Sequence, residues 1–230
     1  MNGIANSLIK KSAIALGALT LGACSFNMEI NGSQNWKIEG DTKEGCLTVI
    51  DNFFKGTIAK KNTVVTVSQG TNSMTLNILG DKAVLDVAGE KSYAYVQDGK
   101  YYVATAAGEG GSVIESKTQY DSIYSRYMMN IDAIRNIKEE EGMTFYAKDE
   151  GFGTFSNNSS KNRSESTLEV KVAAKGQGEF NIAASAKNSL VETMKVTIKF
   201  EEDTPDHVVD YAFAYGSAKV ELPDTSNWAK

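Results

Sequence analysis

Few residue patterns in this sequence point to a nucleophile, a general base or a metal site. The single histidine, His207, follows Asp206 at the end of the acidic run 201–207, and together with one of the many serines it would nominally complete a Ser-His-Asp triad. A nucleophilic serine is commonly presented on a Gly-x-Ser-x-Gly turn, which the sequence lacks. We therefore interpret 201–207 as a solvated turn between strands, expect no catalytic residues and predict that the protein is not an enzyme.

Metal binding is equally poorly supported. The carboxylates of 201–207 lack the alternating Asp-x-Asp-x-Asp-Gly spacing of a calcium loop, and one histidine leaves little basis for a histidine-based zinc site. Glu139, Glu140 and Glu141 follow a predicted helix and are interpreted as its solvated end. We expect neither a metal nor a cofactor.

The two cysteines have different surroundings. Cys46 lies beside the apolar stripe of a predicted helix, and no neighbouring histidine or second cysteine supports a reactive thiol. We interpret Cys46 as a buried, free, small apolar side chain.

Cys24 ends a segment with the features of a targeting signal. A polar stretch closes with Lys10 and Lys11, and the uncharged run 12–23 follows. Twelve helical residues span roughly 18 Å, which is well short of the ~30 Å hydrocarbon core of a membrane. The pattern is typical of a cleaved signal peptide over 1–23; an apolar helix of the folded domain is the alternative.

The residues around the cleavage point narrow this interpretation. Leu21, Gly22, Ala23 and Cys24 resemble the bacterial lipobox, although an ordinary secretory signal would share the preceding features. The resemblance implies that the Cys24 thiol receives a diacylglycerol, that the signal is cut before Cys24, and that the new amino terminus is acylated with a fatty acid such as palmitate. The mature protein would then be held by its acyl chains in a bacterial cell envelope, facing outside the cytoplasm.

The charge composition argues against a nucleic-acid partner. The formal net charge is −5, from 24 Lys and Arg against 29 Asp and Glu, and the sequence pI is about 5.1. Cleavage before Cys24 would remove both Lys10 and Lys11 and make the chain more acidic. Nucleic-acid binders usually carry basic surfaces, so we expect no nucleic-acid partner. The polar segment 24–40 is interpreted as the lipidated cysteine and a flexible tether.

Two helices are expected in the body of the chain. Apolar residues recur at three- and four-residue spacing over 42–59, where Asp41 or Thr42 would cap the start. A longer stripe of tyrosine, isoleucine and methionine predicts one continuous helix over 115–138.

Most of the remaining chain alternates apolar and polar residues with a period of two, which predicts antiparallel strands with one buried face. Asp98-Gly99 predicts a tight hairpin turn, and the polar run 157–166 is interpreted as a mobile loop. The expected fold is α+β: a large curved antiparallel sheet, or half-barrel, packed against two main amphipathic helices. The alternating runs are 74–78, 93–96, 168–172, 180–182, 194–200 and 211–215.

This order of elements resembles the lipoprotein-carrier superfamily, which includes LolA/LolB-like and LppX/LprG-like proteins. The resemblance rests on a helix after the tether, the hairpin series around Lys91–Tyr102, a mid-chain helix and late long strands, and it places a single domain over 41–222 with a C-terminal tail over 223–230. It implies a curved sheet wrapped around helices, with space between them for acyl chains.

We accordingly expect a non-enzymatic, membrane-anchored protein that binds or carries a lipid or the acyl chains of another lipoprotein. The alternative is a cavity-free module that binds another envelope protein; a solute-binding or hydrolytic lipoprotein is a third candidate. The candidate lining of an apolar cavity comprises Ile123, Tyr127, Met128, Met194, Val196, Ile198 and Phe200.

Overall fold

The computed structural model describes residues 32–107, 110–155, 161–174, 178–200 and 204–229. The predicted signal peptide, the lipobox residues Leu21, Gly22 and Ala23, and the predicted acylation site Cys24 lie outside the described residues.

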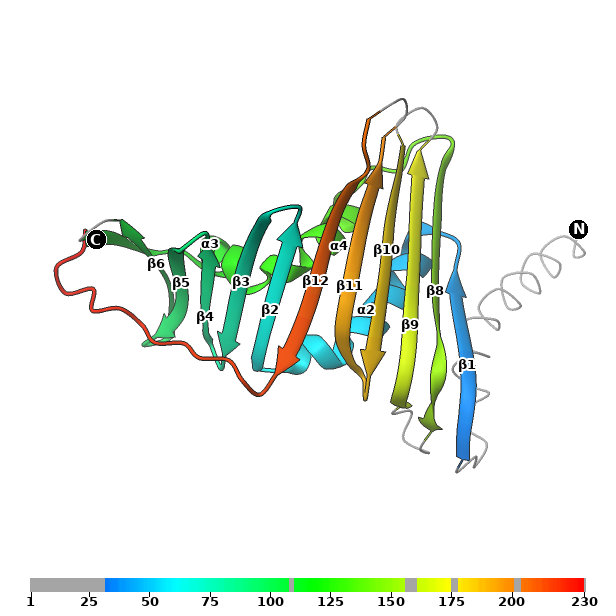
Figure 1. Ribbon diagram of the computed structural model, residues 1–230, viewed down its shortest axis with the longest axis horizontal. Helices are drawn as coiled ribbons and strands as arrows, with labels where there is room; N and C mark the ends of the chain where they lie inside the picture. Colours follow the sequence, from blue (N-terminus) through cyan, green and yellow to red (C-terminus); the bar gives the residue numbers. More distant parts are fainter. Residues whose placement is uncertain (1–31, 108–109, 156–160, 175–177, 201–203, 230) are drawn as a thin grey trace, which may run out of the picture.

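Twelve strands form one open antiparallel sheet, and the helices lie on one of its faces (Figure 1). The strand order is β1-β8-β9-β10-β11-β12-β2-β3-β4-β5-β6-β7, so β12 joins the late strands to the early meander. These findings confirm an α+β protein built mainly of antiparallel sheet. The strands are β1 (Gly32–Gly40), β2 (Asn62–Gln69), β3 (Asn72–Leu79), β4 (Lys82–Val87), β5 (Glu90–Gln97), β6 (Lys100–Ala107), β7 (Gly110–Glu115), β8 (Met143–Phe155), β9 (Lys161–Ala174), β10 (Gly178–Lys187), β11 (Leu190–Lys199) and β12 (His207–Tyr215).

The alternation predicted from sequence matches burial in β11 but not in β5, where the adjacent Ala94 and Tyr95 are both buried. On β11, Met194 and Val196 are buried while Thr193 and Lys195 between and beside them are exposed. Successive side chains of a strand point to opposite faces, so the buried set faces the helices and the polar set faces away. The predicted hairpin turn between β5 and β6 is confirmed: Asp98 and Gly99 both have positive φ, at 51° and 75°.

Helix α2 (Lys43–Ala59) confirms the first predicted helix. The Thr42 side chain accepts a hydrogen bond from the Gly45 amide and caps the first turn. At the other end, the Val191 amide donates to Thr57 Oγ1 over 2.9 Å, which ties α2 to the start of β11. Residues Cys46, Val49, Ile50, Phe53, Phe54 and Thr57 of α2 are buried.

The second predicted helix is interrupted, contrary to the expectation of one continuous helix over 115–138. It consists of α3 (Lys117–Tyr124), the single 3-10 turn η2 (Arg126–Met128) and α4 (Met129–Asn136). Ser125 lies at the break with φ −102° and ψ 18°, and its hydroxyl donates to the Asp121 carbonyl over 2.6 Å. Serine side chains compete in this way with the helical backbone pattern, and apolar periodicity alone does not reveal it.

Two polar segments were wrongly interpreted from sequence. Half of the predicted tether, Gly32–Gly40, is the edge strand β1, and its Trp36 is buried. In the predicted loop 157–166, β9 begins at Lys161, and Arg163 and Ser166 are buried; residues 157–160 lie outside the described residues. Neither segment shows the apolar and polar alternation of a strand in its sequence, because the buried positions carry tryptophan, serine and arginine among polar neighbours.

The C-terminal segment returns along the sheet to β7 (Figure 1). The Ala229 amide donates to the Gly111 carbonyl over 3.0 Å, and the Val113 amide donates to the Ala229 carbonyl over 2.8 Å. The Trp228 ring lies directly against Gly111, where a Cβ atom would come within 2.5 Å of the ring. The segment thereby covers part of an edge strand.

Candidate functional site

A continuous apolar cluster fills the space between the helices and the sheet. Helix α2 supplies Ile50, Phe53 and Phe54, and the inner faces of β9 to β12 and of β2 supply the side chains opposite them. Aromatic side chains extend the cluster toward β6, where Tyr101 and Tyr120 meet edge to face with ring centroids 5.0 Å apart.

Five of the seven predicted cavity residues belong to this cluster. Ile123, Tyr127 and Met128 come from α3 and η2, and Met194 and Val196 come from β11 with 1% and 0% of their surface exposed. Ile198 packs against the cluster from its margin.

Phe200 lies apart from the other six. Strand β11 ends at Lys199, and Phe200 is 47% exposed. The apolar repeat of 194–200 continues past the last residue that pairs with the neighbouring strands, so periodicity extended the predicted lining too far.

We call residues 126–136, which comprise η2 and α4, the connecting segment. It follows α3 in the chain and contacts β12. The Tyr127 ring meets the Phe213 ring edge to face with centroids 5.9 Å apart, and the Asn130 amide donates to the Tyr211 hydroxyl over 2.6 Å. Ile131 and Ile134 of the same segment are fully buried.

Polar contacts fasten the connecting segment to α2. Arg135 forms an ion pair with Asp51 of α2 and a second one with Asp132 over 2.9 Å. The Lys43 ammonium donates to the Ile137 carbonyl over 2.5 Å. The side chains that hold this segment at its α2 side are therefore exposed or half-exposed, while its sheet side is apolar except for the hydrogen bond from Asn130 to Tyr211.

Sequence reasoning missed the residues of β12 in this region. Tyr211 and Phe213 were recognised as part of an alternating strand, but their contact with η2 and α4 depends on β12 lying between β11 and β2. Nothing in the alternation states which strands are neighbours, so no local signal would have placed them here.

Burial shifts the pKa values of several groups in the apolar cluster between the helices and the sheet, which we also call the apolar layer. It raises the pKa of the Tyr127 phenol to about 12 and also raises that of Tyr211. The Cys46 thiol is fully buried, and burial raises its pKa to about 11. This confirms the interpretation of Cys46 as a buried free thiol, which is protonated and weakly nucleophilic at neutral pH.

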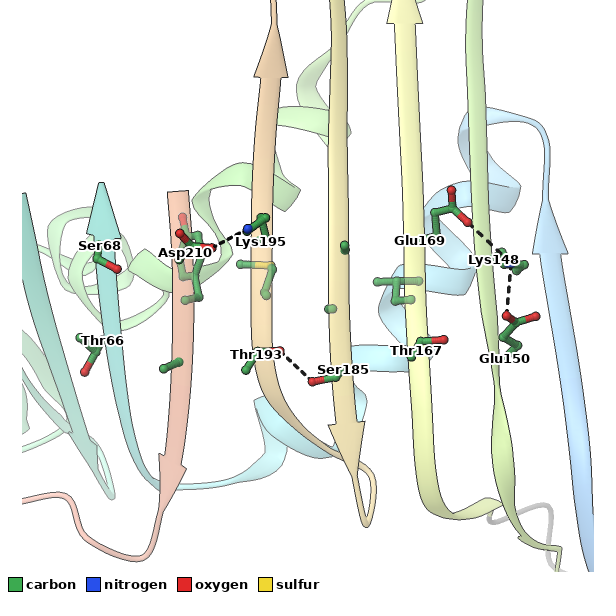
Figure 2. Close-up of a pocket in the computed structure, with 16 residues that line it drawn as sticks. Thr66, Ser68, Lys148, Glu150, Thr167, Glu169, Ser185, Thr193, Lys195 and Asp210 are labelled. Atoms are coloured by element: carbon green, nitrogen blue, oxygen red, sulfur yellow. Dashed lines mark hydrogen bonds and ion pairs between the residues drawn. The ribbon is translucent and has the colours of Figure 1, made fainter. Parts of the chain in front are cut away.

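The opposite face of the sheet, which the helices leave uncovered, carries a shallow hollow of about 760 Å³ over β2 and β8–β12 (Figure 2). Small and hydroxyl side chains line its floor, and Ser185 and Thr193 are hydrogen-bonded across β10 and β11 at 2.7 Å. Charges at its sides are paired: Lys195 with Asp210 at 3.6 Å, and Lys148 with Glu150 and Glu169 at 3.2 and 3.6 Å.

A second hollow, of about 790 Å³, adjoins the first over β1 and β8–β11 and shares Glu150, Thr167 and Ser185 with it. Phe152, which is 45% exposed, lies at this second hollow.

The side chains that could bind a metal ion are dispersed over the described residues. Within the described ranges, no three His, Cys, Asp or Glu side chains come close enough to hold a metal ion. His207 is exposed at the start of β12 and is hydrogen-bonded to Gln69 of β2.

Among the described helices, none has the length and apolar character needed to span a bilayer. Comparisons of the sequence with protein families and with curated proteins find no match to either.

Proposed function

We propose that this chain is a bacterial envelope lipoprotein, anchored through acyl chains on Cys24, whose domain binds or carries an apolar ligand without catalysing a reaction. The anchor rests on the lipobox-like residues Leu21–Cys24 and on the charged and apolar segments before them. Each buried methylene contributes ~0.8 kcal/mol to membrane attachment, so two or three acyl chains would hold an acidic protein without help from anionic headgroups.

In this proposal, the domain is a half-barrel wrapped around amphipathic helices, and the ligand lies between the connecting segment and the sheet. One observation carries it: the segment that lies against Tyr211 and Phe213 on the inner face of β12 consists of short helical pieces that follow a break at Ser125. The continuous helix α2 instead packs on β1, β8 and β11. Short segments joined at a break can move independently of the sheet at a lower cost than a continuous element.

The chemistry of the layer suits an acyl chain. An acyl chain would replace the contact that Tyr127 now makes with Phe213 of β12 and would fill the space of Met128 and Ile131, so the apolar surface would remain covered after the connecting segment moves. Met128 and Met194 bring flexible side chains that adapt to different ligand shapes. Opening would also require the exposed ion pair between Arg135 and Asp51 to separate, which typically costs no more than about 1 kcal/mol.

The test is a titration of the soluble chain from Ser25 onward, which contains every described element, with a fluorescent fatty acid. We expect saturable binding at micromolar concentration. Val196→Trp should reduce this binding while largely preserving the melting temperature of the lipid-free domain, because the added ring would occupy the ligand's place. In a core that never opens, the same change would strain the packing by about 1–3 kcal/mol.

Two further variants keep this test decisive if Val196→Trp does not fold. Ile198→Trp adds the same bulk at the margin of the cluster, and it should also weaken binding. Thr197→Trp adds it between these positions on the opposite face and should leave binding unchanged. A wild-type domain that binds no probe would refute lipid binding.

The uncovered hollow favours a second candidate function, in which the same anchored domain is an interaction module for another envelope protein. Its floor of small side chains would admit an extended segment, and its paired charges would line that segment on both sides. Ala183→Trp would fill the hollow without touching the inner layer. Loss of a cross-linked envelope partner in this variant, with fatty-acid binding absent throughout, would support the interaction module over the lipid carrier.

A further inference from the structure

Arg126 is the one arginine without an ionic partner in the part of the chain that the structure describes. The chain has three arginines, and the other two, Arg135 and Arg163, are each paired with carboxylates. The Arg126 Nε is buried and has no hydrogen-bond partner, although the side chain as a whole is only half-buried. Placing a cation beside an apolar cluster without a counter-charge is costly, so its position calls for an explanation.

Two polar groups lie near this cation. Asn130 is one helical turn after Arg126, and its amide donates to the Tyr211 hydroxyl over 2.6 Å. The charge of Arg126 acts on Tyr211, where it partly opposes the rise in the phenol pKa that burial causes. Tyr211 is 3% exposed and stands on the inner face of β12 beside Met194 of β11.

The hydrogen bond from Asn130 leaves the Tyr211 proton available. Because the phenol oxygen accepts from Asn130, its own O–H can donate to another oxygen, and it donates to no other group in the described part of the chain. The unpartnered Arg126 Nε and the phenol O–H of Tyr211 therefore belong to the same part of the apolar cluster, close enough for the charge of Arg126 to act on the phenol. Two donors, one of them charged, suit an oxygen that carries a negative charge.

We propose that Arg126 and Tyr211, with Asn130 orienting the phenol, bind the anionic oxygen headgroup of an amphiphile whose acyl chain lies in the adjacent layer. This inference rests on the proposed lipid binding and narrows it from apolar ligands in general to amphiphiles with a carboxylate or phosphate group. The half-buried position of Arg126 puts the headgroup at the margin of the layer, where the acyl chain is buried and the charge remains near water.

The experiment compares ligands that share one acyl chain and differ only in the headgroup. Oleate, oleyl phosphate and oleyl alcohol are titrated by displacement of a fluorescent fatty-acid probe from the soluble chain. We expect at least one of the two anions to bind about tenfold or more tightly than the alcohol, as a charge-assisted hydrogen bond predicts. The ratio between oleate and oleyl phosphate then shows which anionic group the site prefers.

Variants assign the preference to the named groups. Arg126→Met should bring the anion-to-alcohol ratio close to one while leaving alcohol binding within about twofold, and Arg126→Lys should retain part of the preference. Tyr211→Phe should lower the ratio by a smaller factor because it removes one neutral donor. Arg135→Met is the matched control: it removes a cation of the same segment whose charge is already paired, and it should not alter the ratio.

The outcomes separate the two levels of the proposal. Binding of all three ligands with equal affinity by the wild-type domain would overturn the headgroup site and leave lipid binding intact. Binding of none would overturn lipid binding itself. An anion preference that survives Arg126→Met would show that another group recognises the charge and would refute the assignment to Arg126.

Discussion

The guanidinium of Arg163 on β9 lies 2.6 Å from the carboxylate of Asp149 on β8, and both side chains are almost fully excluded from solvent. The Trp36 indole of β1 donates to the same carboxylate over 3.3 Å. The guanidinium also lies over the rings of Trp36 and of Phe53, at 5.6 and 5.7 Å from their centroids. One buried ion pair thus connects the edge strand, two long strands and α2.

Breaking this pair should be much more damaging than replacing it. Arg163→Met leaves the Asp149 carboxylate without its counter-charge in the core, and we expect it to lower the free energy of unfolding by about 3–5 kcal/mol. The double variant Arg163→Met with Asp149→Leu removes both charges and should recover much of that loss. Chemical denaturation of the three proteins tests this, and equal stability of the single variant and the wild type would contradict it.

The connecting segment should be anchored by its buried face. Ile131→Asp places a carboxylate at a fully buried position and should cost several kcal/mol, measured as a large drop in melting temperature. Ala133→Asp introduces the same group at an exposed position of the same helix and should cost only about 0.7 kcal/mol through helix propensity. Similar melting temperatures for the two variants would show that α4 does not dock through Ile131.

The contact between the C-terminal segment and β7 should be sensitive to a single methyl group. Gly111→Ala adds a Cβ that would come within 2.5 Å of both the Trp228 ring and the Thr105 carbonyl, whereas the space around a Cβ at Gly110 is open. We expect Gly111→Ala to accelerate hydrogen exchange of the Val113 amide, which donates to Ala229, and Gly110→Ala to leave it unchanged. Identical exchange rates in both variants would mean that the contact does not protect this edge.

The predicted anchor depends on one sulfur atom. Cys24→Ala removes the thiol that would receive the diacylglycerol, so the variant should lose metabolic fatty-acid labelling. It should also leave the membrane fraction or remain uncleaved. Unchanged labelling and unchanged membrane retention would refute the lipoprotein assignment.

Local signals allowed the sequence to predict several elements well. The cap at Thr42, the helix α2 and the Asp98-Gly99 turn each depend on residues close together in the chain, and the structure confirms all three. The break at Ser125 escaped prediction because a serine hydroxyl can bond to its own helix without disturbing the apolar stripe around it.

The features that the sequence did not predict depend on pairing between strands that are far apart in the chain. Nothing in the polar run 157–166 shows that Arg163 is buried, since its partner Asp149 belongs to another strand and a bulge between Phe152 and Gly153 shifts the register between them. The candidate site has the same limit. Met194, Val196 and Met128 belong to one large apolar cluster, as their apolar character predicts, but Tyr211 and Arg126 became recognisable only once β12 was placed beside β11.

Native mass spectrometry of the soluble domain, purified from its own host without detergent, tests the central claim most directly. A domain that carries an amphiphile should appear with an added mass that is released as a fatty acid or phospholipid on activation, and Val196→Trp should reduce that added mass. A wild-type domain that appears only at its polypeptide mass, and that takes up no fatty acid when one is supplied, would contradict lipid binding and leave the interaction module as the function to test.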